Sequence, residues 1–363
     1  MSRNRRFNLN EVFDAVAALF RPESGREILK AIADTHAPSQ TVHYTRAIAV
    51  QQILEKHGNG SYSFDVNYAK TGNALLALGS RVPRILFFAH ADEISYLVGN
   101  QDNDSWALIP YCNHGAEIEH AAIGLRYEPS ANKLQQIAEG VIKNVNHGDD
   151  VVPHFFAIKG SVQPGDRIVY HHPLKIEGDI ARGSLDNSAG ATACLLAALA
   201  LCQVAPAVPV AFVFTDEEEG PPASNSTFGR GARRLSGMFD SPDLCVVVDG
   251  HDVSQQCSIG DGAVFAEKAS PSKGGGIVPP HVYATFRLLA HDMVARGVDV
   301  TENLGHVSRS DDVACIEVTP NILLLGYPVS DPHFNQAVPA VSLSDILNLS
   351  KAIYRTAIAD LGV

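Results

Sequence analysis

The acidic run Thr215–Gly220, with the sequence Thr-Asp-Glu-Glu-Glu-Gly, holds the densest group of chemically reactive side chains in the chain. It directly follows the apolar segment 209–214, which predicts a buried strand that delivers these carboxylates at its end. Adjacent like charges repel one another, and a metal ion or a shared proton relieves that repulsion. A solvated acidic loop is the alternative for such a run on its own, so the rest of the chain must decide between them.

Five further residues of suitable type stand at the ends of predicted elements: His90, Asp92, Asp186, Asp249 and His333. Taken singly, His90 could be a core histidine and Asp186 a helix cap. Asp249 could be a turn residue, and His333 a loop histidine with Asp331 as its nearest rival. In open α/β sheets, however, ligands collect at the carboxyl ends of the strands, so we expect these side chains to converge. Two histidines with carboxylates and no thiolate form the ligand set of a hydrolytic zinc, cobalt or manganese site, and the donors exceed what one ion needs.

The surrounding pattern predicts how these residues are positioned. Helices are predicted at 9–20, 24–33, 43–57, 188–202, 227–235, 281–296 and 343–358. Strands are predicted at 61–66, 74–78, 84–89, 209–214, 244–248 and 321–325. This alternation predicts an α/β fold with a mostly parallel sheet covered by helices on both faces. Residues 95–181 differ: short alternating segments separated by turns predict a small inserted β-barrel or sandwich.

Composition narrows the class of protein. A chain of 363 residues suits two domains. The net charge of -12 argues against binding to nucleic acid and to anionic membranes. No apolar segment is long enough to span a bilayer, and the arginine-containing N-terminus does not read as a secretory signal. Six cysteines without a Cys-x-x-Cys pair favour a reduced, cytoplasmic protein.

Four motifs together resemble one family. They are His-x-Asp-Glu at 90–93, Gly-Asp at 165–166, Leu-Asp-Asn at 185–187 and Glu-Glu-x-Gly at 217–220. This set resembles the TET-type (deblocking aminopeptidase) family of co-catalytic metallo-aminopeptidases, within the clan of di-zinc exopeptidases. The resemblance implies a catalytic α/β domain at 1–94 and 182–363, with a PDZ-like β domain inserted at 95–181. It also implies a homo-oligomer, often a dodecamer, and two divalent metal ions, with Zn²⁺ first and Co²⁺ or Mn²⁺ as alternatives.

The resemblance also assigns roles to the candidate residues. It implies that His90 and Asp249 bind one ion, that Glu218 and His333 bind the other, and that Asp186 bridges them. Glu217 is then the general base that acts on a metal-bridging hydroxide, and Asp92 orients His90. Asp216 and Glu219 are expected to be supporting or solvated. In related enzymes the peptide bond after the bridging aspartate tends to be cis, so a cis bond is expected between Asp186 and Asn187.

The implied activity is the removal of N-terminal residues from peptides. An amidohydrolase or deaminase that acts on a small non-peptide C–N bond is the alternative, because the loops at 221–224 and 330–334 depart from the family's pattern. A binding module without activity is a third reading. His306 with residues 310–312 resembles a family loop near the active site, and His251 and Asp252 could line the pocket. The pair at 171–172 is expected at a surface turn or an interface.

Overall fold

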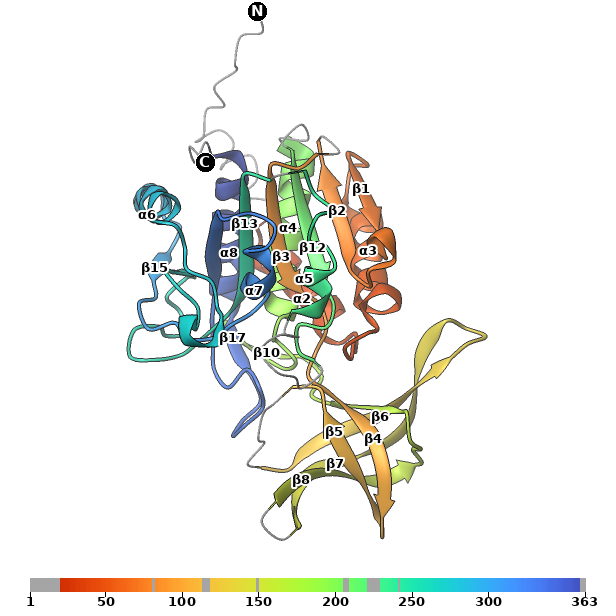
Figure 1. Ribbon diagram of the computed structural model, residues 1–363. Coiled ribbons are helices and arrows are strands. Elements are labelled where there is room, and N and C mark those ends of the chain that lie inside the picture. Colours follow the sequence, from red (N-terminus) through yellow and green to blue (C-terminus); the bar gives the residue numbers. More distant parts are fainter. Residues whose placement is uncertain are drawn as a thin grey trace, which may run out of the picture.

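The computed structural model describes residues 20–79, 82–112, 118–147, 150–204, 209–220, 229–240 and 242–359. These residues form a mixed sheet covered by helices and, beneath it in Figure 1, a closed barrel of six strands. The α/β class and the mixed sheet predicted from the sequence are confirmed. Apart from Phe20, the predicted helix 9–20 lies outside the described residues. Of the predicted helix 227–235, residues 229–235 are described, and a short helix spans Arg230–Arg233 there.

The main sheet has eight strands in the order β1-β2-β12-β3-β13-β16-β14-β15. Their bounds are β1 Tyr62–Asp65, β2 Ala74–Leu78, β3 Ile85–His90, β12 Val210–Thr215, β13 Leu244–Asp252, β14 Ala263–Ala266, β15 Val300–Glu302 and β16 Ile322–Val329. Strands β12, β3, β13 and β16 run parallel to one another. The parallel centre is rich in Val, Leu and Phe because it is buried on both faces, and its strands all end at the same edge.

Helices cover both faces of this sheet. They are α2 Pro22–Ala33, α3 Arg46–His57, α4 Ser188–Val204, α5 Arg230–Arg233, α6 Pro280–Ala295, α7 Asp312–Cys315 and α8 Leu343–Ile358. In Figure 1, α4 and α8 lie behind the central strands and the short α5 and α7 lie in front of them. Helix α4 consists mainly of Ala and Leu, so small side chains let it pack closely on the sheet.

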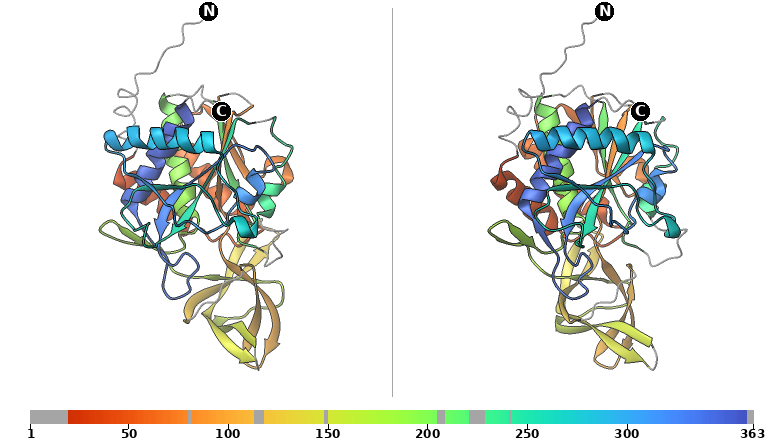
Figure 2. Two further views of the ribbon diagram at one scale, coloured as in Figure 1. Left: turned by 60° about the vertical axis from the view of Figure 1, so that its left-hand side comes forward. Right: turned by 90° about the vertical axis from the view of Figure 1, so that its left-hand side faces the viewer.

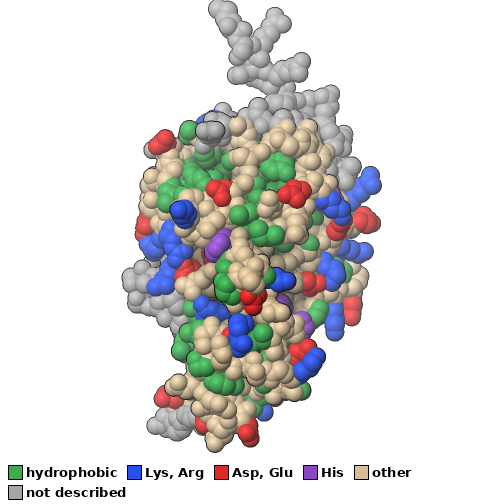
Figure 3. All heavy atoms as spheres, turned by 90° about the vertical axis from the view of Figure 1, so that its right-hand side faces the viewer, with side chains coloured by type: hydrophobic (Ala, Val, Ile, Leu, Met, Phe, Trp, Pro, Cys, Tyr) green, Lys and Arg blue, Asp and Glu red, His purple; other side chains and the backbone are tan. Residues whose placement is uncertain are grey.

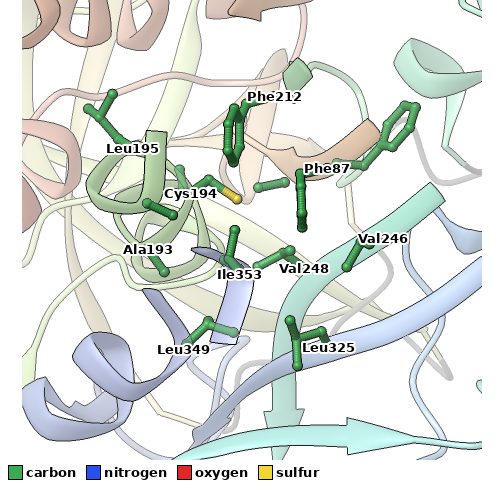
Figure 4. Packing of buried hydrophobic residues seen from close by; sticks show 14 of the residues in the cluster. Phe87, Ala193, Cys194, Leu195, Phe212, Val246, Val248, Leu325, Leu349 and Ile353 are labelled. Carbon is green, nitrogen blue, oxygen red and sulfur yellow. The ribbon is translucent and has the colours of Figure 1, made fainter. Parts of the chain in front are cut away.

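Figure 4 shows apolar side chains packed in the core between α4, α8 and the sheet. Phe87 of β3 and Phe212 of β12 stack there, with ring centroids 5.0 Å apart and planes 15° apart. Leu349 and Ile353 of α8 close the same cluster from the helix side. This packing holds the carboxyl ends of β3, β12 and β13 in fixed relative positions.

The barrel is built from the chain between β3 and α4. Its strands are β4 Ser95–Asp102, β5 Ser105–Pro110, β6 His120–Glu128, β7 Lys133–His147, β8 Asp150–Gly160 and β9 Arg167–Tyr170, closed in the order β4-β5-β8-β7-β6-β9. Figure 2 shows it projecting from one end of the α/β part. The strands that follow, β10 Lys175–Glu177 and β11 Ile180–Arg182, form a separate small sheet with β17 Ala340–Ser342. The domain boundaries at 94/95 and 181/182 and the PDZ-like character of the insertion stay predictions.

Charge is spread over the surface without a one-sign patch on the face in Figure 3, where acidic and basic side chains alternate. None of the helices in the described ranges is long and apolar enough to cross a membrane.

Candidate metal centre

Three carboxylates surround one ring nitrogen of His90 at the end of β3. The Nε2 atom lies 3.2 Å from Asp186 Oδ1, 3.7 Å from Asp249 Oδ1 and 3.9 Å from Glu218 Oε2. Parallel pairing of β3 with β12 and β13 brings these strand ends together, as the sequence predicted. The alternative considered from the sequence was that His90 is an ordinary core histidine. A ring with three carboxylates around one nitrogen does not fit that alternative.

Asp186 connects this group to a second histidine. Its other oxygen, Oδ2, lies 3.4 Å from Nε2 of His333, which follows β16. The helix cap is provided by the next residue: Asn187 Oδ1 accepts the backbone N–H of Gly190, and its Nδ2 donates to the carbonyl of Val248. Asp186 therefore does not cap the helix, and both of its carboxylate oxygens face the site. The expected cis peptide bond between Asp186 and Asn187 is confirmed.

The acidic run divides differently from the sequence assignment. Glu217 has a positive φ of 55°, and its carboxylate turns away from the histidines. There it pairs with Arg234, lies 3.7 Å from Arg230 and accepts a hydrogen bond of 3.0 Å from Gln40 Nε2. It is buried and does not line the cavity at the site. The structure thus places the residue expected to be the base in an ion pair outside the cluster.

Glu218 and Glu219 are the two glutamates that enter the site. Glu218 faces His90, whereas Glu219 has its carboxylate near Cys112 and His333. The sequence led us to expect that Glu219 is either supporting or solvated. It is only 4% exposed, so it is not solvated. Asp216 is supporting: its oxygens accept the backbone N–H groups of Gln40, Val42 and Glu217.

Asp92 holds the acidic run against β3. Its Oδ1 accepts the N–H of Glu218 and its Oδ2 the N–H of Glu219, each at 3.1 Å, while Ser39 donates to Oδ2 at 2.6 Å. Oδ1 also lies 3.5 Å from Nδ1 of His90, on the far side of the ring from Asp186. Asp92 therefore fixes both the orientation of His90 and the backbone that carries the two glutamates.

Burial and crowding shift the protonation of these groups. Burial lowers the pKa of His90, but Glu218, Asp249 and Asp186 outweigh it and raise that pKa well above its usual value. Burial also raises the pKa of Glu218, and it raises the pKa of Glu219 to about 8 with help from Asp186. A proton on Glu218 or Glu219 therefore relieves the repulsion between these carboxylates where no cation does so.

The donor set fits two divalent cations. The groups His90, Asp186 and Asp249, and separately Cys112, Glu219 and His333, each offer ligand atoms within 4.8 Å of one another. Glu219 Oε1 is buried without a hydrogen-bond partner, which costs about 1–3 kcal/mol unless something positive approaches it. A carboxylate between two histidine-containing groups is the arrangement of a bridged two-metal site.

A cavity of about 800 Å³ opens above these residues. Its wall includes residues that the sequence did not single out: Tyr111, Cys112, Ser270, Lys273 and Arg309. Tyr111 and Cys112 come from the inserted segment just after β5, where a lone cysteine carries no spacing signal. Gly220 was the available clue, because a Cβ there would lie 2.5 Å from the carbonyl oxygen of Tyr111.

The loop after β16 shows which of Asp331 and His333 faces the site. Asp331 accepts the backbone N–H groups of Asn335 and Gln336 at 2.9 and 2.7 Å, so it closes the loop, and it is His333 that faces Asp186. Phe334 inserts into the barrel core, 4.4 Å from the ring of Tyr170. Its carbonyl oxygen lies 2.7 Å from Nε2 of His120. Through Phe334, the barrel thereby positions His333, the residue that precedes it.

The remaining candidates lie around this centre. His306 stacks on His251 with centroids 3.8 Å apart, and neither lines the main cavity. Asp311 accepts a hydrogen bond from Thr215. Asp252 does line the cavity. His171 and His172 lie at an interface within the chain, against His36 and Phe334 respectively. The loop 221–224 lies outside the described residues.

Comparisons with known proteins show the family and the fold of the chain. The model of peptidase family M20/M25/M40 matches residues 162–359, which is more than half of the chain. No curated protein matches the chain. Among solved structures, the TET1 peptidase of Pyrococcus horikoshii is 20% identical with a TM-score of 0.69, and the match covers 92% of this chain and 99% of that one.

Two further solved structures are similar over most of their length. An aminopeptidase from the archaeon Desulfurococcus kamchatkensis is 18% identical with a TM-score of 0.71, covering 92% of this chain and 94% of that one. A TET aminopeptidase from a marine sediment Thaumarchaeota archaeon is 16% identical with a TM-score of 0.71, covering 92% and 96%. At these identities the likeness shows a shared fold.

Proposed function

This chain belongs to the peptidase family M20/M25/M40, and we propose that it is a metal-dependent aminopeptidase that removes N-terminal residues from peptides. One observation carries the proposal: the two oxygens of Asp186 face Nε2 of His90 and Nε2 of His333 at 3.2 and 3.4 Å, at the floor of a large cavity. A single carboxylate shared by two histidines is what a pair of hydrolytic ions requires.

Each ion has its own set of ligands in this proposal. His90 and Asp249 hold one, Glu219 and His333 hold the other, and Asp186 contacts both. When bound, two such cations, Zn²⁺ or else Co²⁺ or Mn²⁺, supply Lewis acidity to a scissile carbonyl and lower the pKa of the attacking water. Asp92 acts through His90, because its carboxylate lies against Nδ1 and so directs Nε2 into the site.

Glu218 is the general base in this proposal, one position later than the sequence assigned it. Its carboxylate lies in the cavity beside His90, whereas that of Glu217 is held by Arg234 and Gln40. Its position beside His90 at the cavity would let it accept a proton from a water there and hand it on. The leaving amine of the peptide receives that proton.

The cavity wall points to substrates with a carboxylate. Lys273 and Arg309 line it across from the acidic floor, and Arg309 donates to the carbonyl of Lys273 at 3.0 Å. The acidic floor suits the amine of a peptide N-terminus, and the basic wall suits the C-terminus of a short peptide or an acidic side chain. This combination favours short peptides.

Assembly and location complete the proposal. Pyrococcus horikoshii TET1 peptidase can assemble into a tetrahedron or a large octahedral shell. We expect this chain to form a homo-oligomer too, with the barrel contributing contacts, and to act in the cytoplasm. Light scattering of the purified protein measures the first expectation directly.

A substrate panel with metal replacement tests the activity. Aminoacyl anilides and short peptides are offered beside N-acyl amino acids and aromatic amines, with chelated enzyme and enzyme reloaded with Zn²⁺, Co²⁺ or Mn²⁺. We expect cleavage of the anilides and peptides that is lost on chelation and regained with metal. Turnover of only the N-acyl or aromatic amine compounds would instead favour an amidohydrolase or deaminase. No bound metal and no turnover would leave a binding module.

A further inference from the structure

Cys112 stands at the site with no role in the function proposed above. Its sulfur lies within 4.8 Å of ligand atoms of Glu219 and His333, and the residue lines the cavity. We propose that Cys112 is a ligand of the ion held by Glu219 and His333, so that the inserted segment completes the metal centre. This inference rests on the proposed function, since it requires that ion.

The chain positions Cys112 rigidly for this role. The preceding residue, Tyr111, donates its N–H to the carbonyl of Ser95 at 2.8 Å, and its backbone lies directly on Gly220. The guanidinium of Arg167 lies 4.2 Å above the Tyr111 ring, and the Tyr111 hydroxyl donates to Gln40 Oε1 at 3.3 Å. These contacts hold Tyr111, the residue before Cys112, against the acidic run.

Gln40 links this support to the acidic run itself. Its Nε2 donates to Glu217, while its Oε1 accepts from Tyr111 and from Arg167. Glu217 thus gains a structural purpose that explains why it turns away from the cavity: it anchors the residue before the cysteine.

The unpartnered oxygen of Glu219 is the second, independent sign of a ligand at this place. Oε1 is buried and has no hydrogen-bond partner among the described residues, although Cys112 lies beside the same carboxylate. With Cys112, the donors around this position are one sulfur, one nitrogen and the carboxylates of Glu219 and Asp186. Four donors of these types match the tetrahedral preference of Zn²⁺.

Ligation has a defined proton balance and a defined preference. The bond from sulfur to the metal forms as the thiol proton leaves for solvent, so binding at this position releases one more proton than a site without Cys112. Thiolate favours Zn²⁺ and Co²⁺ over Mn²⁺, which prefers oxygen donors. A chain with Cys112 replaced should therefore discriminate less strongly against Mn²⁺.

Cobalt spectroscopy tests the proposal without relying on activity. Chelated enzyme is titrated with Co²⁺, metal content is measured by mass spectrometry, and the near-ultraviolet sulfur-to-cobalt charge-transfer band is recorded. The variants are Cys112→Ser and Cys112→Ala, and the matched control is Cys202→Ala. Helix α4 begins at Ser188, two residues after Asp186, and Cys202 lies near its carboxyl end. At 1.5 Å per residue, Cys202 is about 21 Å from Ser188.

We expect the band in the parent and in C202A and its loss in both Cys112 variants. Zinc affinity of one of the two ions should fall in those variants by at least the about 10–100-fold that removal of an outer-shell partner costs. Two bound Co²⁺ ions without the band in the parent, or a band that survives in C112S and C112A, would overturn the proposal and leave the aminopeptidase function standing. A parent that binds no Co²⁺ at all would overturn both.

Discussion

Replacing each of the three adjacent glutamates by glutamine, one at a time, gives three different outcomes if the structure places them correctly. Glu217 pairs with arginines outside the cavity, Glu218 faces His90 within it, and Glu219 faces His333. The same chemical change, loss of one negative charge with the shape kept, therefore acts on an ion pair, on a base and on a metal ligand. The three variants are matched controls for one another.

The expected magnitudes differ in kind. Glu217→Gln leaves Arg230 and Arg234 without their partner, but each is more than a third exposed and can turn to solvent, so the free energy of unfolding should fall by only about 1 kcal/mol. Its turnover per metal-loaded molecule should stay near that of the parent. Glu218→Gln should lower kcat about 10²–10⁴-fold, or about 2.7–5.4 kcal/mol of barrier, and keep both ions.

Stability sets the last two variants apart from Glu217→Gln, and metal content separates them from each other. Burial and nearby carboxylates raise the pKa of Glu218, so removing its charge should stabilise the metal-free protein. Glu219→Gln should stabilise it as well, because burial and Asp186 raise the pKa of Glu219 to about 8, but this variant should bind only one ion tightly.

The assay combines three measurements on each variant: metal content after dialysis, kcat and KM on an aminoacyl anilide, and chemical denaturation of the metal-free protein. The reasoning fails if Glu217→Gln keeps both ions and loses the hundredfold or more in kcat, while Glu218→Gln retains near-parent kcat or loses an ion. That outcome would restore the assignment made from the Glu-Glu-x-Gly motif.

Four further predictions follow from particular contacts. Asp186→Asn should weaken both metal sites together, because each of its oxygens faces a different histidine, and the metal content at equilibrium measures this. Phe334→Ala should weaken the ion at His333 and raise KM more than it lowers kcat, because the 3% exposed ring holds that loop in the barrel; zinc titration and Phe334→Leu as a milder control test it. Arg309→Met should raise KM for short peptides with a free C-terminus and leave KM for amidated peptides unchanged, which steady-state kinetics on the two series will show. Finally, the metal-free protein should lose stability as pH rises from 4.5 towards about 8, since the folded state keeps a proton on Glu219 that the unfolded chain has released; denaturation at several pH values should lose this slope when Zn²⁺ is added.

Much of the centre could be predicted because it depends on strand ends. His90 ends β3, and Asp249 lies in β13, which pairs in parallel directly with β3, so their meeting follows from the topology. Asp186 precedes a helix whose Ala-rich sequence predicts that it packs closely on the sheet. Strand boundaries could also be predicted: the predicted strand 74–78 is the observed β2.

The division of labour within the acidic run could not be predicted, because three adjacent glutamates offer two readings of one motif. The choice depends on a backbone angle, the positive φ of Glu217, and on partners distant in sequence. Arg234 lies 17 positions further on and Gln40 lies 177 positions earlier. No local pattern contains that information. Phe334 was equally hidden, since its partners belong to another part of the chain.

The inserted barrel supports the site on two sides. The position of part of the candidate metal centre at the sheet edge therefore depends on the barrel. On one side, Tyr111 lies on Gly220 at the end of the acidic run, and on the other, Phe334 anchors the loop that carries His333. Both supports act on the proposed ligands Glu219 and His333, whereas His90 and Asp249 belong to central strands of the sheet. Any movement of the barrel should therefore disturb one ion before the other, and metal titration of Phe334→Ala should show one unchanged and one weakened site.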